Sequence, residues 1–208
     1  MMAEYCIYFI IYGFLGWIYE SLFYSAQLKK PVNTGFLHGC LCPIYGLACV
    51  ANIALLYRTE NNTKVFLISI LIISAIEYAV SYILEAVFGK RWWDYTNWPC
   101  NLNGRISLIS SLAFGILSML QLRVIHPFIE SGVAVLPQEL KSIFLVVVVV
   151  CTIADLLYTL RRMNKEEERY WFLDEEAEFA KRTFDRIETD RIQNVKEYIK
   201  RSLSSWRL

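Results

Sequence analysis

Long apolar runs fill most of the first 160 residues, and short polar stretches separate them. Each run is about 20 residues long, which at about 1.5 Å per residue suffices for a helix to cross a hydrocarbon core about 30 Å thick. The pattern therefore predicts an all-α fold, a polytopic membrane bundle of about five transmembrane helices. We expect the spans at about residues 4–24, 39–57, 64–88, 106–128 and 140–160.

The pattern changes after residue 160, where charged residues become dense. Apolar residues recur every three or four positions there, for example at Leu173, Ala177 and Ala180, which is typical of an amphipathic helix. We therefore predict two parts, a transmembrane domain over residues 1–160 and a charged helical tail over residues 161–208. The tail either docks onto a partner or a second copy of the chain, or it folds onto the membrane surface or onto its own membrane domain.

Composition supports a membrane protein, since 56% of the 208 residues are hydrophobic. The tail holds more than half of the Lys and Arg residues but nearly as many Asp and Glu, and the whole chain has a net charge of +1. Such a balance does not favour nucleic acid as a partner. The first apolar run has no basic leader and no small-residue cleavage site, so we expect it to remain as a helix.

The distribution of Lys and Arg over the loops predicts the orientation, because cytoplasmic loops carry an excess of these residues. With the N-terminus outside, the inner loops and the start of the tail are clearly more basic than the outer loops. The inner basic residues are Lys29, Lys30, Lys90, Arg91, Arg105, Arg161, Arg162, Lys165 and Arg169. We therefore predict a multi-pass protein of the cell membrane, in contact with the lipid bilayer, with its N-terminus outside and its tail in the cytoplasm.

Glu77 lies near the middle of the apolar run from Val65 to Phe88, at a depth where a bare carboxylate is costly. Such a residue is tolerated when it is neutral, paired, or facing a cavity. Two interpretations stay open. Glu77 is either a neutral side chain that hydrogen-bonds between helices as structural glue, or a functional group that binds a proton or a cation.

Other polar residues converge on the cytoplasmic boundary of the predicted bundle. Glu20 and Glu85 lie near the inner ends of the first and third spans, and Arg105 opens the fourth span at the same depth. An ion pair between Arg105 and one of these carboxylates is therefore expected. The candidate substrate- or ion-binding residues are Glu20, Asn33, Glu77, Glu85, Asp94, Asn103 and Arg105. Ordinary snorkelling and helix capping are the alternative explanation for this cluster.

The first inner loop, residues 31–46, contains three glycines and Pro43 within apolar sequence. These helix breakers predict a helix interrupted at membrane depth or a short re-entrant segment, which is tolerated only where protein or water satisfies the backbone. His38, Cys40 and Cys42 alternate in this loop, but zinc-binding cysteines are usually spaced by two to four residues. We predict no metal and no cofactor.

Several short motifs are similar to those of a known family. They are Gly16-Trp17 with Glu20, Asn33-Thr-Gly-Phe-Leu37, Cys42-Pro-Ile-Tyr-Gly46, Glu77-Tyr78, Glu85, Trp93-Asp-Tyr95, Asn103-Gly-Arg-Ile106 and His126-Pro127. In order and spacing, the chain from about Tyr8 to Phe128 resembles the putative ABC-transporter type IV (CmpB-like) family of bacterial membrane proteins. The resemblance implies a multi-spanning domain of the bacterial inner membrane that acts as a transporter permease. The chain departs from the family at Thr34, where Arg is usual, and at Cys40, where Pro is usual.

The chain contains no GxxxxGK[ST] pattern for nucleotide binding and no GxSxG or HExxH hydrolase motif, so enzymatic activity is not favoured. A permease component would then depend on a separate ATPase subunit or on assembly into a homo-oligomer. Two other functions stay open. One is an intramembrane enzyme that modifies a lipid or isoprenoid with the inner carboxylates, and the other is a membrane scaffold or sensor acting through the tail. A polar route across the bilayer would favour transport.

Overall fold

The computed structural model describes residues 2–163 and residue 193. The chain divides into two units, Met1–Glu166 and Glu167–Leu208. Apart from residues 161–163 and 193, the predicted tail lies outside the described residues. The elements of the first unit are α1 (Met2–Leu28), α2 (Pro43–Leu56), α3 (Asn62–Phe88), β1 (Asn101–Leu102), β2 (Ile106–Ser107), α4 (Leu108–Leu120), η1 (Gln121–Ile125), α5 (His126–Val135) and α6 (Gln138–Met163).

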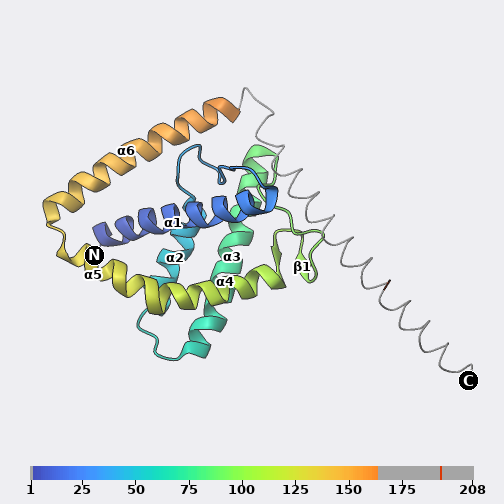
Figure 1. Ribbon diagram of the computed structural model, residues 1–208, viewed down its shortest axis with the longest axis horizontal. Helices are drawn as coiled ribbons and strands as arrows, with labels where there is room; N and C mark the ends of the chain where they lie inside the picture. Colours follow the sequence, from blue (N-terminus) through green and yellow to red (C-terminus); the bar gives the residue numbers. More distant parts are fainter. Residues whose placement is uncertain (1, 164–192, 194–208) are drawn as a thin grey trace, which may run out of the picture. The chain divides into compact units, whose positions relative to one another are not determined.

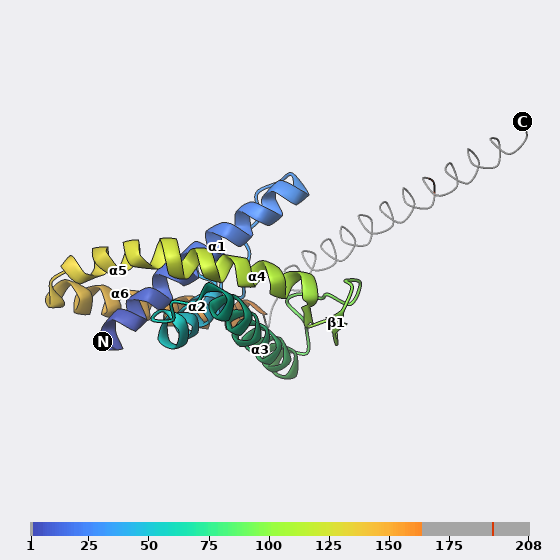
Figure 2. The same ribbon diagram turned by 90° about the horizontal axis from the view of Figure 1, so that it is seen from below.

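The all-α membrane bundle predicted from the sequence is confirmed. Within the described residues, four helical stretches are long and apolar enough to cross a membrane, namely Ala3–Leu28, Asn62–Phe88, Leu108–Val135 and Gln138–Arg162. In the bundle, α1 packs most extensively on α2, and α3 packs on α4 (Figures 1 and 2). The short antiparallel pair of β1 and β2 lies beside the start of α4.

The second predicted span, residues 39–57, forms a shorter helix than expected. α2 begins at Pro43, which favours the first turn of a helix because it lacks a backbone N–H and has a fixed φ. Residues 39–42 remain outside the helix, and the Cys42 N–H donates instead to the carbonyl of Gly13, in the middle of α1, at 3.0 Å. The first loop thus reaches back to the middle of α1, and α2 has only 14 residues.

The fourth predicted span, residues 106–128, is longer than expected, because α4, η1 and α5 follow one another from Leu108 to Val135. Pro127 lies inside this stretch, where in a regular helix its ring would clash with the Arg123 carbonyl. The π-helical turn η1 immediately precedes it, and the His126 N–H donates to the carbonyl of Gln121. This wider turn allows the helix to continue through Pro127.

Local sequence signals set the other helix ends. The Asn61 side chain accepts a hydrogen bond from the Lys64 N–H at 3.0 Å and caps the start of α3. α3 ends at Gly89, whose φ of 72° lies in the left-handed region that glycine adopts without strain. Ser107 and Ser110 cap the start of α4 reciprocally.

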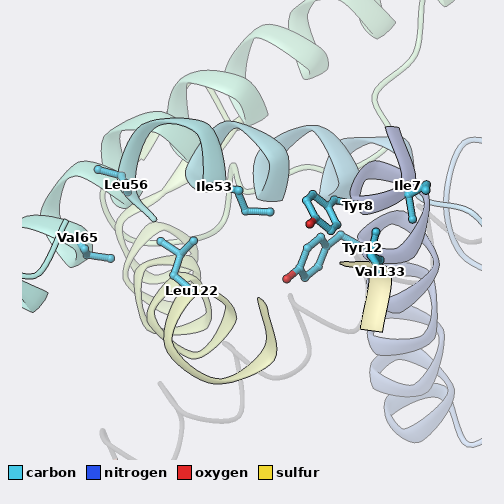
Figure 3. Close-up of a cluster of buried hydrophobic side chains, with 8 residues drawn as sticks. All are labelled: Ile7, Tyr8, Tyr12, Ile53, Leu56, Val65, Leu122 and Val133. Carbon is cyan, nitrogen blue, oxygen red and sulfur yellow. The ribbon is translucent and has the colours of Figure 1, made fainter. Parts of the chain in front are cut away.

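One end of the bundle, which we call the N-terminal end, joins α1, α3, α5 and α6. Lys141 of α6 forms an ion pair with Glu4 of α1 at 3.4 Å. The main buried cluster lies nearby and joins α1 to α2, α3, η1 and α5 (Figure 3). It consists of Ile7, Tyr8, Tyr12, Ile53, Leu56, Val65, Leu122 and Val133.

The opposite end, which we call the loop end, collects residues 29–42 and 89–107. The rings of Phe36 and Phe88 lie 5.4 Å apart, and both contact Trp92. The first loop is also tied to α6, because the Gly39 N–H donates to the Asp155 carboxylate at 2.9 Å. All segments predicted to be cytoplasmic within the described residues therefore lie at one end.

Two glycines allow α1 and α2 to cross closely. A Cβ atom on Gly16 would overlap the Tyr45 side chain, and one on Gly46 would overlap the backbone carbonyl of Phe9. Neither position has room for a larger residue unless the helices separate. This close crossing places Tyr45 against Gly16, one turn before Glu20 on α1.

Candidate functional site

Two carboxylates of the bundle lie in one polar group, which we call the carboxylate site. It consists of Glu20 on α1, Cys42 in the first loop, Tyr45 on α2, Glu77 on α3 and Tyr95 in the second loop. The sequence places these five residues far apart. The loop that returns to the middle of α1 and the α1–α2 crossing bring them together.

Glu77 is the most buried carboxylate of the site, with only 5% of its surface exposed. Its Oε1 accepts a hydrogen bond from the Tyr95 hydroxyl at 3.0 Å. Its Oε2 is buried and has no hydrogen-bond partner among the described residues. A buried charge without a partner costs several kcal/mol, so an ionised Glu77 is costly in this position.

Glu20 occupies the other side of the site. The Cys42 thiol donates to Glu20 Oε2 with an Sγ–O distance of 3.2 Å. Tyr45 of α2 lies near enough to both Glu20 and Tyr95 to interact with them electrostatically. Among the described residues, the hydrogen bonds to Glu20 and Glu77 come from Cys42 and Tyr95 and not from a basic residue.

A second polar group, the arginine cluster, contains Arg105, Glu85 and Arg91. Arg105 is 8% exposed and forms an ion pair with Glu85. Its guanidinium also donates to Ser81 at 3.2 Å, and it lies over the rings of Tyr78 and Tyr82.

Glu85 is the shared anion of the arginine cluster. It also binds Arg91 at 3.1 Å, and its side chain is about one-third exposed. The sequence predicted Glu85 or Glu20 as the partner of Arg105, and the structure places Glu85 there. Each guanidinium group of the arginine cluster therefore has a carboxylate partner, and Glu85 is shared between the two.

Asp94 and Asn103 shape the second loop. Asp94 Oδ1 accepts hydrogen bonds from the Thr96 backbone and hydroxyl, and Arg91 lies 3.8 Å away. Asn103 has a left-handed φ of 54°, and its side-chain amide donates to the Tyr78 hydroxyl at 3.0 Å. The Tyr95 N–H donates to the Gly104 carbonyl at 2.7 Å. This folded loop holds Tyr95 over Glu77.

Asn33 is engaged within the first loop. Its side-chain oxygen accepts from the Trp17 indole at 2.6 Å, and its amide donates to the His38 carbonyl at 2.7 Å. Asp155, near the end of α6, accepts a hydrogen bond from the backbone N–H of Gly39. Both residues position the loop that carries Cys42.

The structure thus separates the predicted candidates into three groups. Glu20 and Glu77 share the carboxylate site, Glu85 and Arg105 form an ion pair, and Asn33, Asp94 and Asn103 organise the loops. The sequence analysis missed the donors Cys42, Tyr45 and Tyr95 as site residues. Their signal was present, because the motifs Cys42-Pro-Ile-Tyr-Gly46 and Trp93-Asp-Tyr95 each contain a side-chain donor.

Comparison with known proteins gives one finding. Residues 7–160 match the profile of a family described as putative ABC-transporter type IV. The match extends beyond the segment whose motifs suggested the resemblance and includes α6. No curated protein and no solved structure matches the chain.

Proposed function

We propose that this chain, which belongs to the putative ABC-transporter type IV family, is the permease component of a transporter of the bacterial inner membrane. In this proposal the carboxylate site binds a proton or a small cation, with Glu77 as the principal ligand and Glu20 as the second. The observation that carries the proposal is the buried Glu77 carboxyl group, which has a free oxygen directed away from its one donor.

The polar residues beyond Glu77 favour transport over a scaffold. They continue along α3 and α4 towards the N-terminal end, beside the main buried apolar cluster. Ser74 and Ser111 bond to each other at 2.8 Å, and Ser69 is fully buried. Asn52 donates to Ser118 at 2.9 Å. These residues offer a polar path away from Glu77 across the bundle.

The orientation follows the distribution of positive charge. We place the loop end in the cytoplasm, because Lys29, Lys30, Lys90, Arg91 and Arg105 lie there or next to it. The carboxylate site then lies in the inner half of the membrane. Energy from ATP would come from a separate ATPase subunit, since this chain has no nucleotide-binding motif.

Glu77→Gln tests the role of the carboxyl group, since glutamine keeps its size and its hydrogen bond with Tyr95 but cannot ionise. In proteoliposomes with an imposed proton, Na⁺ or K⁺ gradient, we expect the wild-type protein to carry a flux that Glu77→Gln abolishes. The matched control is Glu60→Gln, an exposed glutamate outside the helices, which should retain the flux. Equal flux through wild-type and Glu77→Gln protein, with both properly folded, would make Glu77 interhelical glue.

Chemical labelling of Glu77 tests whether its carboxyl group binds a proton or a cation, independently of any flux. Hydrophobic carbodiimides modify protonated carboxyl groups, so mass spectrometry after labelling should find Glu77 modified. A bound cation or a higher pH should slow this reaction, because each removes the protonated form. If Glu77 stays unmodified under all these conditions while the protein is folded, the carboxyl group does not exchange protons and the proposed site is wrong.

A further inference from the structure

A second group of buried polar side chains lies around His126, towards the N-terminal end and away from the carboxylate site. His126 is 0% exposed and directly follows the π-helical turn η1. The ring centroids of Tyr57, Tyr8 and Tyr12 lie 4.5, 4.9 and 6.1 Å from that of its imidazole. Tyr8 and Tyr12 reach from α1 into the space beside Ile53 and Leu122 (Figure 3).

Four polar atoms of this group are buried and have no hydrogen-bond partner among the described residues. They are both ring nitrogens of His126, the Tyr12 hydroxyl and Asn52 Oδ1. Tyr12 is 3% exposed and Asn52 is 0% exposed. Each such atom left without a partner costs about 1–3 kcal/mol, so hydrogen-bond partners for these four atoms would stabilise the fold.

The neighbouring side chains extend the group in both directions. Asn52 donates to Ser118 at 2.9 Å and to Gln121 at 3.4 Å, and the Gln121 side chain lies near the Tyr12 hydroxyl without reaching hydrogen-bond geometry. On the other side of His126, the Tyr57 hydroxyl donates to Glu130 at 2.6 Å. Glu130 thus has a hydrogen-bond partner in Tyr57, and it also lies near enough to His126 to interact with it electrostatically.

We propose that the unpaired atoms of His126, Tyr12 and Asn52 bind a small cluster of internal water molecules. A neutral imidazole offers one donor and one acceptor, a tyrosine hydroxyl offers both, and Asn52 Oδ1 offers an acceptor. Water forms two to four hydrogen bonds and matches this mixture of donors and acceptors. A metal ion does not match it, and the described residues contain no group of His, Cys, Asp and Glu that would hold one.

The water cluster connects His126 to the Asn52–Gln121–Ser118 group. It makes a hydrated path in the half of the bundle that lacks the carboxylate site. The π-helical turn contributes Gln121 at its start and His126 immediately after its end, so a single irregular turn supplies two of the polar groups. The inference concerns the resting protein and does not rest on the transport proposal, although a transported proton or ion would use such a path.

The composition of the chain makes the test specific, because it contains only two histidines, His38 and His126. Histidine-labelled protein in lipid bilayers gives two sets of imidazole signals in solid-state NMR, and His38→Gln assigns them. Magnetisation transferred from water protons then reports hydration of each ring. His38 is exposed in the first loop and serves as the internal reference. We expect His126 to receive magnetisation from water on the same timescale as His38.

Tyr12→Phe provides the matched variant, since it retains the buried ring and removes only the hydroxyl. We expect most of the water-derived His126 signal to be lost, while the His38 signal stays unchanged. The wild-type measurement decides the question even if the variant is unstable. The proposal is wrong if the His126 imidazole receives no magnetisation from water at mixing times at which the transfer to His38 is complete. Unchanged transfer in a folded Tyr12→Phe protein would also overturn it.

Discussion

At the scale of single residues, the two polar groups near the loop end differ in how their charges are compensated. Arg105 has an ion pair, a serine and two aromatic rings around its guanidinium. Glu77 has one hydroxyl donor and a second oxygen without a described partner. A charge with a full set of partners is typical of a residue that stabilises the fold. A buried polar group that lacks a partner is typical of a residue that binds a ligand.

The arginine cluster predicts an asymmetry between its two partners. Glu85→Ala leaves the guanidinium of Arg105 buried without its carboxylate, whereas Arg105→Met removes the buried charge and leaves Glu85 with Arg91 and solvent. We expect Glu85→Ala to lower the thermal unfolding temperature in detergent more than Arg105→Met does. Glu60→Ala, at an exposed position, is the control and should have little effect. If Arg105→Met lowered the unfolding temperature more than Glu85→Ala, the packing of the Arg105 side chain would contribute more to stability than its ion pair.

At the scale of elements, the position of α2 depends on close helix contact rather than on a long apolar surface. Its 14 residues are too few to cross the hydrocarbon core alone, at about 1.5 Å per residue. Gly16 and Gly46 let α2 press against α1, as small residues do in membrane helix pairs. The carboxylate site therefore depends on two residues that have no polar side chain.

Two glycine substitutions with opposite effects test this packing. Gly46→Ala places a methyl group against the Phe9 carbonyl, and we expect a loss of about 1–3 kcal/mol in unfolding free energy. Gly132→Ala in α5 meets no atom within 4 Å and should stabilise the helix by about 0.5–1 kcal/mol. Unfolding in mixed detergent micelles measures both. A neutral Gly46→Ala would show that α2 moves away easily and that the crossing is not tight.

At the scale of the whole molecule, the described spans place residues 29–42, residues 89–107 and the end of α6 at one end of the bundle. The opposite end contains the starts of α1, α3 and α6. This arrangement holds for either orientation in the membrane. We propose the orientation with a cytoplasmic loop end, because the loops at that end carry more positive charge.

Cysteine labelling in intact cells tests the orientation. In a background without accessible native cysteines, an impermeant reagent should label Glu60→Cys and should miss Lys30→Cys. Glu60 is preferable to its neighbour Asn61, whose side chain caps α3. After permeabilisation both sites should react, which confirms that both are reachable. Labelling of Lys30→Cys in intact cells would reverse the orientation and move the carboxylate site to the outer half.

The sequence predicted the features that depend on hydrophobicity and depth. Long apolar runs gave the bundle, and the equal depth of Arg105 and the inner carboxylates indicated an ion pair. It could not predict where the second and fourth helices begin and end, because hydrophobicity does not change at those points. Pro43 starts α2 inside an apolar run, and the π-helical turn lets the fourth helix continue through Pro127. Nor could it predict that Cys42 and Tyr95 donate to Glu20 and Glu77. Those contacts require two loops to fold back onto helices that are distant in sequence.

The rotation of α6 about its own axis is fixed by polar contacts near its two ends. Lys141 binds Glu4 near one end of α6, while Asp155 and Thr159 bind the first loop near the other. Between these contacts lies a run of mostly exposed valines, which make equivalent apolar contacts with lipid. Three polar side chains therefore hold the rotation of α6 at its two ends, and Leu145 between them packs against the main buried cluster. Replacing the exposed valines of the run with other apolar residues should leave the rotation of the helix unchanged.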